Sequence, residues 1–292
     1  MENCKVIAVT NQKGGVGKTT TTVNLGVGLA NDGYKVLLID ADPQGSLTVS
    51  LGIKAPDELD VSLASVLDGI INDEPIDSYA GIISHDEGVD LLPSNIELSA
   101  METKLFNTMS REYVLRNYID TVRQDYDYIL IDCMPSLGMM TINALVAADS
   151  VIIPSQPNFL STKGLNLLLH SISKVKRSIN PNLRIDGILL TMVDSRTSNA
   201  RNIIDSLRSG VGQNIRVFDT EIPHSVRAAE CSLTGQSIFA HDKNGKVAVA
   251  YEAMAKEVEG IEERSKNRSG PDWVSVEYIT CEAGEDILDE EA

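Results

Sequence analysis

The sequence predicts an α/β fold, with a twisted and mostly parallel sheet that carries helices on both faces. Apolar, strand-like runs alternate with helical stretches from the first residues onward. Interleaving of this kind is typical of parallel sheets covered by helices on both sides. Hydrophobic residues make up 42% of the 292 residues and aromatic residues only 4%, a balance that favours a core of aliphatic side chains.

The strands and helices follow one another in a regular order. Strands are predicted at Lys5–Thr10, Lys35–Asp40, Val89–Leu92, Tyr128–Asp132, Ser150–Pro154 and Arg184–Thr191. Helices are predicted at Thr19–Asn31, 97–123, Leu137–Ala147, Thr162–Ile179, Ala200–Ser209 and Val247–Arg264, with short helices within 54–95. Asp32 and Gly33 end the first helix, and the Asp42-Pro43 pair ends the second strand.

Charge divides the chain into a domain over residues 1–264 and an acidic tail over residues 265–292. The formal net charge is −17, and residues 269–292 contain eight acidic residues and no Lys or Arg. Residues 174–227 contain nine Lys or Arg and five Asp or Glu, a mildly basic stretch. The total charge argues against nucleic-acid binding, but the basic stretch keeps that function open. The tail also contains a candidate strand at Trp273–Thr280.

Cysteine spacing and hydropathy exclude several classes of protein. The cysteines at positions 4, 133, 231 and 281 form no CxxC pair, which argues against a metal site or a disulfide framework. No apolar run reaches the roughly 18 residues that span a bilayer. Because no signal peptide precedes the first strand, we expect a cytoplasmic protein.

A glycine-rich segment lies between the first predicted strand and the first predicted helix. It reads Lys13-Gly14-Gly15-Val16-Gly17-Lys18-Thr19-Thr20. The glycines let backbone N–H groups approach a phosphate, and the helix N-terminus adds partial positive charge. The Lys18 ammonium could reach the β- and γ-phosphates, and the Thr19 hydroxyl could bind Mg²⁺. The segment predicts a P-loop NTPase with ATP and Mg²⁺ as cofactors.

The segment departs from the common phosphate-loop pattern, because Gln12 replaces its first glycine and Lys13 adds a second lysine. Together with residues 10–12 it resembles the deviant Walker A motif of the ParA/MinD family. In that family the extra lysine contacts nucleotide bound to the partner subunit. The resemblance implies this role for Lys13 in an ATP-dependent homodimer. It covers residues 4–264 and leaves no room before the loop for an N-terminal helix-turn-helix domain, as in the short, Soj-like form.

Two aspartate segments resemble the family's switches. Asp40-Ala41-Asp42-Pro43-Gln44-Gly45 resembles the first switch. The resemblance implies that Asp42 orients or activates the attacking water and that Asp40 helps to organise the Mg²⁺ shell. The strand ending at Asp132 has the Walker B arrangement, in which the carboxylate holds a metal-bound water. In the second switch, Met134 replaces a proline that the family usually has, which reduces the stiffness expected of this loop.

The C-terminal half resembles the family at two further segments, 190–197 and 222–230. The resemblance implies base contacts from Met192, Pro223 and Ser225. His224 and Ser225 replace the usual Arg and Asn. Arginines that match Arg196 and Arg227 contribute to sequence-independent binding of double-stranded DNA in Soj-like members. Ordinary surface ion pairs are the alternative role for both side chains.

These features predict a slow, switch-like ATPase of DNA partition that is stimulated by a ParB-like partner and associated with the nucleoid. A MinD-like membrane switch is one alternative, but that class ends in a basic amphipathic helix, whereas Asp289, Glu290 and Glu291 end this chain. A relative of the nitrogenase reductase is a second alternative. It would need paired cysteines for an iron–sulfur cluster, but Cys133 lies beside the second switch and no suitably placed second cysteine is evident. A cargo other than a plasmid or chromosome, such as a conjugative element or a protein cluster, stays open.

Overall fold

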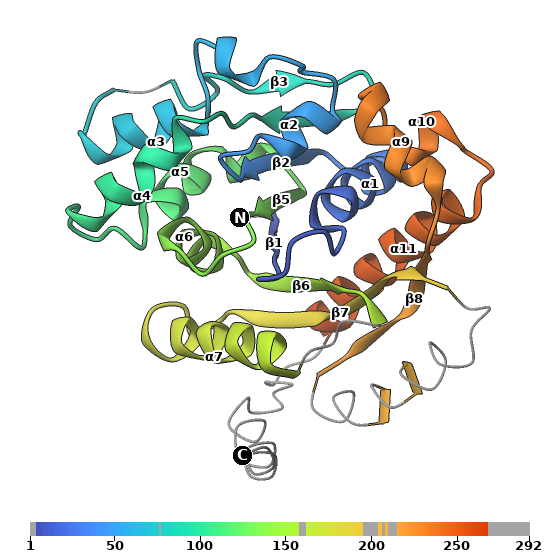
Figure 1. Ribbon diagram of the computed structural model, residues 1–292. Coiled ribbons are helices and arrows are strands. Elements are labelled where there is room, and N and C mark those ends of the chain that lie inside the picture. Colours follow the sequence, from blue (N-terminus) through green and yellow to red (C-terminus); the bar gives the residue numbers. More distant parts are fainter. Residues whose placement is uncertain are drawn as a thin grey trace, which may run out of the picture.

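The computed structural model describes residues 4–75, 77–157, 162–194, 204–205, 208–209 and 215–267. Within these ranges the strands form one eight-stranded sheet of order β3-β4-β2-β5-β1-β6-β7-β8 (Figure 1). Every neighbouring pair is parallel except β3 and β4. The strands are β1 Lys5–Val9, β2 Val36–Ala41, β3 Ile83–Ser84, β4 Val89–Leu92, β5 Tyr128–Cys133, β6 Ser150–Ser155, β7 Arg184–Val193 and β8 Val217–Pro223.

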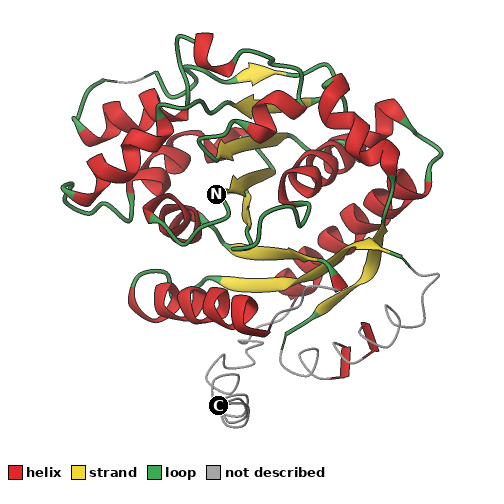
Figure 2. Cartoon of the chain, in the orientation of Figure 1, coloured by secondary structure: helices red, strands yellow, loops and turns green. Residues whose placement is uncertain are grey.

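Helices cover both faces of this sheet (Figure 2), which confirms the predicted fold class. One face carries α3 Leu63–Ile71, α4 Leu98–Phe106, α5 Val114–Val122, α6 Met139–Ala147 and α7 Thr162–Ser178. The other carries α1 Lys18–Asn31, α2 Ser46–Ser50, α9 Val226–Thr234, α10 Ile238–His241 and α11 Lys246–Asn267.

Successive strand residues belong to opposite cores. Val6 and Ala8 pack under the first group of helices, whereas Ile7 packs under the second. Because side chains alternate across a strand, a sheet covered on both faces needs apolar residues at every position. All five residues of β1 are buried, and the four after Lys5 are apolar.

The prediction of one continuous helix over residues 97–123 is wrong, because the helix is interrupted near its middle. The structure has two helices, α4 and α5, separated by residues 107–113. Ser110 adopts a left-handed φ of 52°, which ends helical geometry at that point. The Asn143 side-chain amide then donates to the carbonyl of Arg111 at 2.8 Å and holds the loop against α6.

Other differences concern short elements. The sequence reading missed α2, α9, α10 and the edge strands β3 and β8. The helix predicted at Ala200–Ser209 lies mostly outside the described residues, of which 204–205 and 208–209 are helical. The candidate strand at Trp273–Thr280 lies outside them altogether. No helix within the described ranges is long and apolar enough to cross a membrane. Cys4, Cys133 and Cys231 are buried and free.

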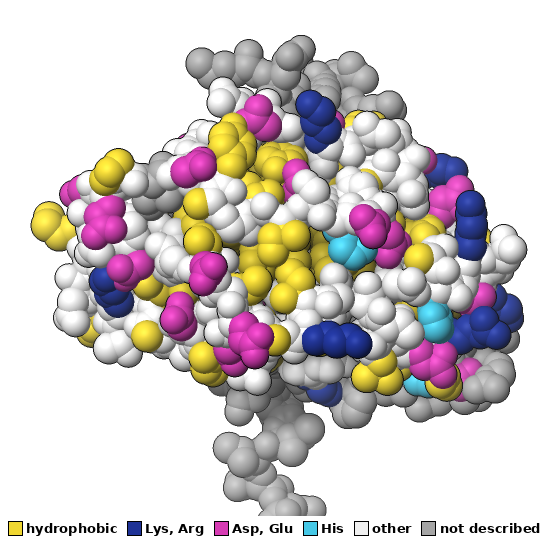
Figure 3. Space-filling view, turned by 90° about the horizontal axis from the view of Figure 1, so that it is seen from above, with side chains coloured by type: hydrophobic (Ala, Val, Ile, Leu, Met, Phe, Trp, Pro, Cys, Tyr) yellow, Lys and Arg dark blue, Asp and Glu magenta, His cyan; other side chains and the backbone are white. Residues whose placement is uncertain are grey.

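The edge formed by β3 is narrow. Viewed from above, hydrophobic side chains gather at the centre of this side of the molecule, with Asp and Glu side chains around them (Figure 3). Tyr79 and Ile83 are among the exposed large hydrophobic residues near this edge. Because β3 has only two residues, this edge of the sheet offers few unpaired backbone N–H and C=O groups, which limits pairing with a strand of another molecule.

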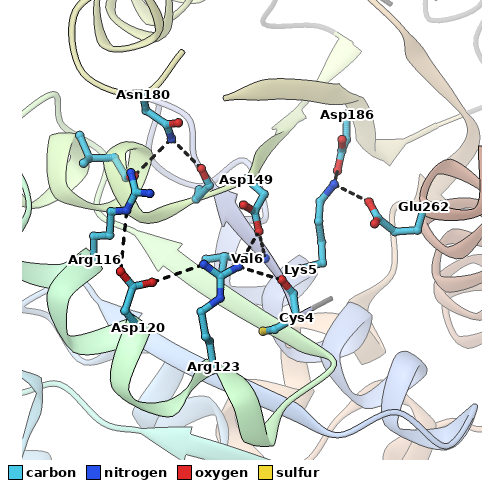
Figure 4. Close-up of polar contacts among 12 residues, drawn as sticks. Cys4, Lys5, Val6, Arg116, Asp120, Arg123, Asp149, Asn180, Asp186 and Glu262 are labelled. Atoms are coloured by element: carbon cyan, nitrogen blue, oxygen red, sulfur yellow. Dashed lines mark hydrogen bonds and ion pairs between the residues drawn. The ribbon is translucent and has the colours of Figure 1, made fainter. Parts of the chain in front are cut away.

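Polar contacts fix the amino end of β1 (Figure 4). The Lys5 ammonium lies 2.5 Å from Glu262 Oε1 of α11 and 3.7 Å from Asp186 Oδ2 of β7. Asp149 accepts a hydrogen bond from the Val6 N–H at 2.9 Å, and Arg123 donates to the carbonyl of Cys4 at 3.1 Å. These contacts lie at the opposite end of β1 from the glycine-rich loop.

Candidate nucleotide-binding site

Three motifs meet at the carboxyl edge of the sheet. The glycine-rich loop follows β1, Asp40 and Asp42 stand at and just beyond the end of β2, and Asp132 lies at the end of β5. Since β5 lies between β2 and β1, Asp132 is in register with Asp40 on one side and with Val9 on the other. Loops at this edge of a parallel sheet form the usual ligand site of the fold.

Glycine is required at two positions of the loop. Gly15 and Gly17 have φ values of 71° and 83°, a left-handed conformation that side chains rarely adopt. A Cβ at Gly14 or Gly15 would meet nothing within 4 Å, so this part of the loop faces open space.

Neighbouring elements hold the loop in place. Thr191 Oγ1 donates to the carbonyl of Val16 at 2.8 Å, and the Gln156 amide donates to the carbonyl of Gly15 at 2.9 Å. Asn11 Oδ1 accepts from the Lys13 N–H at 3.1 Å. These three contacts brace the backbone of the loop against β7, Gln156 and Asn11.

The Lys18 side chain crosses the loop. It is 7% exposed, and its ammonium donates to the carbonyl of Lys13 at 3.1 Å. Burial lowers the pKa of Lys18 from its ordinary value. Thr20 lies in the first turn of α1 and is half-buried. The lysine thus lies where a phosphate seated in the loop would meet its charge.

Thr19 and Asp132 form the part of the site that fits Mg²⁺. The Thr19 hydroxyl donates to Asp132 Oδ2 at 2.6 Å. Asp132 is almost fully buried, and burial together with nearby Asp40 raises the pKa of Asp132 to about 8. A divalent cation would offset this unfavourable buried charge, and both side chains offer the oxygen ligands that Mg²⁺ prefers.

Asp40 is engaged by its own chain. Its carboxylate accepts from the Thr48 N–H at 2.8 Å, from Thr48 Oγ1 at 2.7 Å and from the Asp42 N–H at 3.2 Å. Burial raises the pKa of Asp40 to about 6. Asp42 in turn accepts from the Gln44 N–H at 2.9 Å, which shapes the turn into α2. Asp40 thereby fixes the segment that carries Asp42.

The second switch is held by packing as well as by hydrogen bonds. Met134 is half-buried and packs against the hydrophobic core. The Ser136 N–H donates to the carbonyl of Met134 at 2.9 Å, and Ser136 Oγ accepts from the Gly138 N–H at 3.2 Å. Packing of Met134 thus supplies order where the family usually has a proline.

The predicted base contacts lie in two neighbouring places. Pro223 and Ser225 line a cavity of about 350 Å³ together with His224, Val226, Arg227, Asp242, Lys246 and Val247. Met192 is not part of its lining. It has a φ of 53°, and its side-chain end lies 3.9 Å from where a Cβ of Gly17 would stand. The two places adjoin because Val193 pairs with Pro223 across β7 and β8.

The structure describes only one of the two arginines predicted to contact DNA. The Arg227 side chain is 61% exposed, and its Nη1 lies 3.3 Å from Asp242 Oδ1 in an ion pair. Arg196 lies outside the described residues. DNA binding by either arginine stays a prediction.

Sequence reasoning missed two residues that hold the switches, Thr48 and Glu102. Thr48 binds the Asp40 carboxylate, and Glu102 accepts from the N–H groups of Met139 and Met140 at the start of α6. Neither residue belongs to a motif. Thr48 is 8 positions from Asp40, whereas Glu102 is 37 positions from Met139. Only the helices that bring them together reveal their positions.

Comparison with known proteins identifies the family. Residues 4–185 match a family model described as an AAA domain. The sporulation initiation inhibitor protein Soj of Bacillus subtilis is 43% identical over 87% of this chain and 98% of its own length. The chromosome partitioning protein ParA of Myxococcus xanthus is 39% identical over 87% of each protein.

Solved structures agree with the fold and with the expected cofactors. A Mycobacterium smegmatis protein described as cobyrinic acid a,c-diamide synthase, with bound ADP and magnesium, is 36% identical with a TM-score of 0.77 over 92% of this chain and 98% of that one. An ATP complex of McdA from Cyanothece shares the fold at 22% identity, with a TM-score of 0.74 over 93% and 100% of the two chains. This chain belongs to the Soj/ParA family of partition-type ATPases.

Proposed function

We propose that this protein is a DNA-partition ATPase that binds Mg·ATP, pairs as a sandwich dimer and then binds double-stranded DNA without sequence preference. A ParB-like partner stimulates hydrolysis of ATP to ADP and phosphate and so releases the dimer. The single observation that carries this proposal is the braced loop with two lysines beside the Thr19–Asp132 pair. The Myxococcus xanthus relative is named chromosome partitioning protein ParA, which supports DNA as the cargo.

Each residue at the carboxyl edge has a task in this proposal. The loop from Gly14 to Thr20 surrounds the phosphates, and Lys18 neutralises their charge. Thr19, and Asp132 through a water molecule, would hold Mg²⁺, which would supply positive charge next to the phosphates. Asp42 orients the attacking water, and Asp40 keeps the Asp42 turn in place through Thr48.

Lys13 is the residue proposed to act across the dimer. Its neighbour Gly14 is exposed, so the loop meets solvent on the side away from its own helix α1. A second subunit that approaches this side would bring its nucleotide within reach of Lys13. A cation supplied by the partner would offset the negative charge that builds up on the transferred phosphate.

DNA binding follows from pairing. Each subunit contributes only a weak basic surface, which includes Arg227 and, in the proposal, Arg196. Contacts to phosphates add together and weaken as salt rises, so a dimer binds far better than a monomer. Such a protein would act in the cytoplasm on the nucleoid.

Co-sedimentation with random-sequence duplex DNA tests this function. We expect binding with ATP, little binding with ADP or without nucleotide, and a steep loss of binding as salt rises. Lys18→Ala serves as the control that cannot hold the phosphates. Equal binding with and without nucleotide would show that the protein is not a partition switch. Liposome pull-down tests the MinD-like alternative, for which we expect no ATP-dependent recovery.

A further inference from the structure

Glu102 of α4 completes the start of α6. The first N–H groups of a helix have no partner within the helix, and here the N-cap residue is Gly138, which has no side chain. The Glu102 carboxylate accepts from the Met139 N–H at 2.9 Å and from the Met140 N–H at 3.0 Å. Glu102, 37 positions before Met139, therefore caps the helix α6 that follows the second switch.

Gly138 makes room for this carboxylate. Its φ of −71° is ordinary, so alanine would fit the backbone there. A Cβ at this position would stand only 2.5 Å from Glu102 Oε1 and 2.9 Å from the carboxyl carbon. Glycine is needed here because the carboxylate occupies the adjoining space.

The helix that carries Glu102 is itself held on several sides. Leu98, Met101 and Leu105 are buried in the core, and Lys104 forms an ion pair with Asp68 of α3. The segment before α4 is tied to the first switch, because the Ser94 N–H donates to Thr48 Oγ1 at 3.0 Å.

Thr48 Oγ1 in turn donates to Asp40. The segment leading into α4 therefore contacts the first switch, while Glu102 of α4 contacts the second.

We propose that Glu102 is a positioning residue for ATP hydrolysis. It holds residues 133–138 in place, between Asp132 at the end of β5 and the first turn of α6. Glu102 lies on α4, away from the phosphate loop between β1 and α1. Its loss should therefore slow ATP turnover more than it weakens nucleotide binding. This inference rests on the proposed ATPase function.

Five variants test it: Glu102→Ala, Gly138→Ala, the double variant that combines them, Glu102→Gln, and Thr103→Ala as an exposed control on the same helix. We expect each of the first two to lower kcat about tenfold, with the KM for ATP changed by less than about twofold. The double variant should be no slower than Glu102→Ala, because removing the carboxylate makes room for the new methyl group. Glu102→Gln keeps one acceptor oxygen and should be intermediate.

Two further readouts separate positioning from general stability. Hydrogen exchange of the Met139 and Met140 amides should speed up in Glu102→Ala and stay unchanged in Thr103→Ala. Melting temperatures of Glu102→Ala and Thr103→Ala should agree to within a few degrees. A wild-type chain that hydrolyses no ATP would overturn the proposed function and this inference together. Wild-type turnover with unchanged kcat in the two single variants, or additive losses in the double variant, would overturn the inference alone.

Discussion

Lys13 and Lys18 lie in one loop but face different surroundings. The Lys18 side chain is buried and donates to the carbonyl of Lys13, whereas Lys13 is half-buried beside exposed Gly14. In the proposed function, Lys18 serves the phosphates bound to its own subunit and Lys13 serves the nucleotide of the partner subunit. Lys13→Ala and Lys18→Ala should therefore differ in their effects on dimer formation and on nucleotide binding.

Lys13→Ala should leave binding of ATP to a single subunit close to wild type and abolish ATP-dependent pairing and DNA binding, because the partner's phosphates lose a cation. Lys13→Arg keeps the charge and should restore part of the pairing. Sedimentation velocity with a non-hydrolysable ATP analogue measures the dimer. Unchanged pairing, turnover and DNA attachment in Lys13→Ala would refute the proposed dimer.

Packing and a backbone hydrogen bond hold the chain at Met134 and His224, where residues differ from those usual in the family. Met134 packs against the core, so this loop is ordered without the usual proline. The His224 N–H donates to the carbonyl of Val193 at 3.1 Å. Because any residue except proline can make that bond, the backbone at this point does not depend on the family's arginine.

Among the elements, α11 secures the edge strand β8. Glu257 accepts from Arg216 Nη2 at 2.6 Å, from the Asp219 N–H at 3.0 Å and from the Thr220 N–H at 3.1 Å. Since β8 ends at Pro223, this one carboxylate steadies the strand that leads into the cavity wall.

Glu257→Ala should lower the free energy of unfolding by about 2 kcal/mol, because two backbone donors and a guanidinium lose a charged acceptor. Glu252→Ala is the matched control on the same helix. Its partner is the exposed Lys256, and such pairs contribute about 0.5 kcal/mol or less. Urea unfolding measures both variants, and equal losses would show that the Glu257 contacts add no stability.

A buried charge cluster joins β1, β7 and α11. Lys5 is the cation that faces Asp186 and Glu262, and the Ser150 hydroxyl donates to Asp186 at 2.5 Å. Burial raises the pKa of Asp186, while Lys5 acts in the opposite direction.

Lys5→Met should destabilise the fold by about 3 kcal/mol at pH 8, since it removes the cation that pairs with Asp186 and Glu262. In the variant the pKa of folded Asp186 rises further above its unfolded value. The folded state then binds a proton more tightly than the unfolded state, so the variant loses stability as pH rises through that pKa.

The deficit of Lys5→Met relative to wild type should therefore be smaller at pH 5 than at pH 8. Urea unfolding at both pH values measures it, and the exposed Lys54→Met variant controls for loss of charge. A deficit that does not depend on pH would show that Asp186 stays ionised without Lys5.

For the whole molecule, nucleotide binding and folding are linked. The phosphate loop is braced by Gln156 and Thr191, which follow or lie in β6 and β7, so the site exists only in the folded chain. Mg·ATP at 100 times its Kd should add about 2.7 kcal/mol to the free energy of unfolding. Differential scanning calorimetry should show a rise in Tm of about 5 °C or more in wild type and none in Lys18→Ala. A rise of the same size in that variant would place ATP elsewhere.

The sequence by itself determined the fold class, the six central strands from β1 to β7 other than β3, and the phosphate loop. These follow from local signals, because buried strands are continuously apolar and the loop needs glycine at positions with left-handed φ. The break between α4 and α5 and the edge strands β3 and β8 were decided by tertiary contacts. Asn143 reaches the carbonyl of Arg111, and Glu257 reaches the backbone of β8 from α11.

The same distinction holds at the site. Lys18, Thr19 and Asp132 are predicted as site residues from their motifs, and the structure brings them to one edge because β1 and β5 pair in register. The side chains that hold the switches, Thr48 and Glu102, belong to no motif. The contacts of Glu102 with α6 and of Thr48 with Ser94 form only once separate helices pack on the sheet, because hydrogen bonds between distant segments depend on where the backbone places both partners.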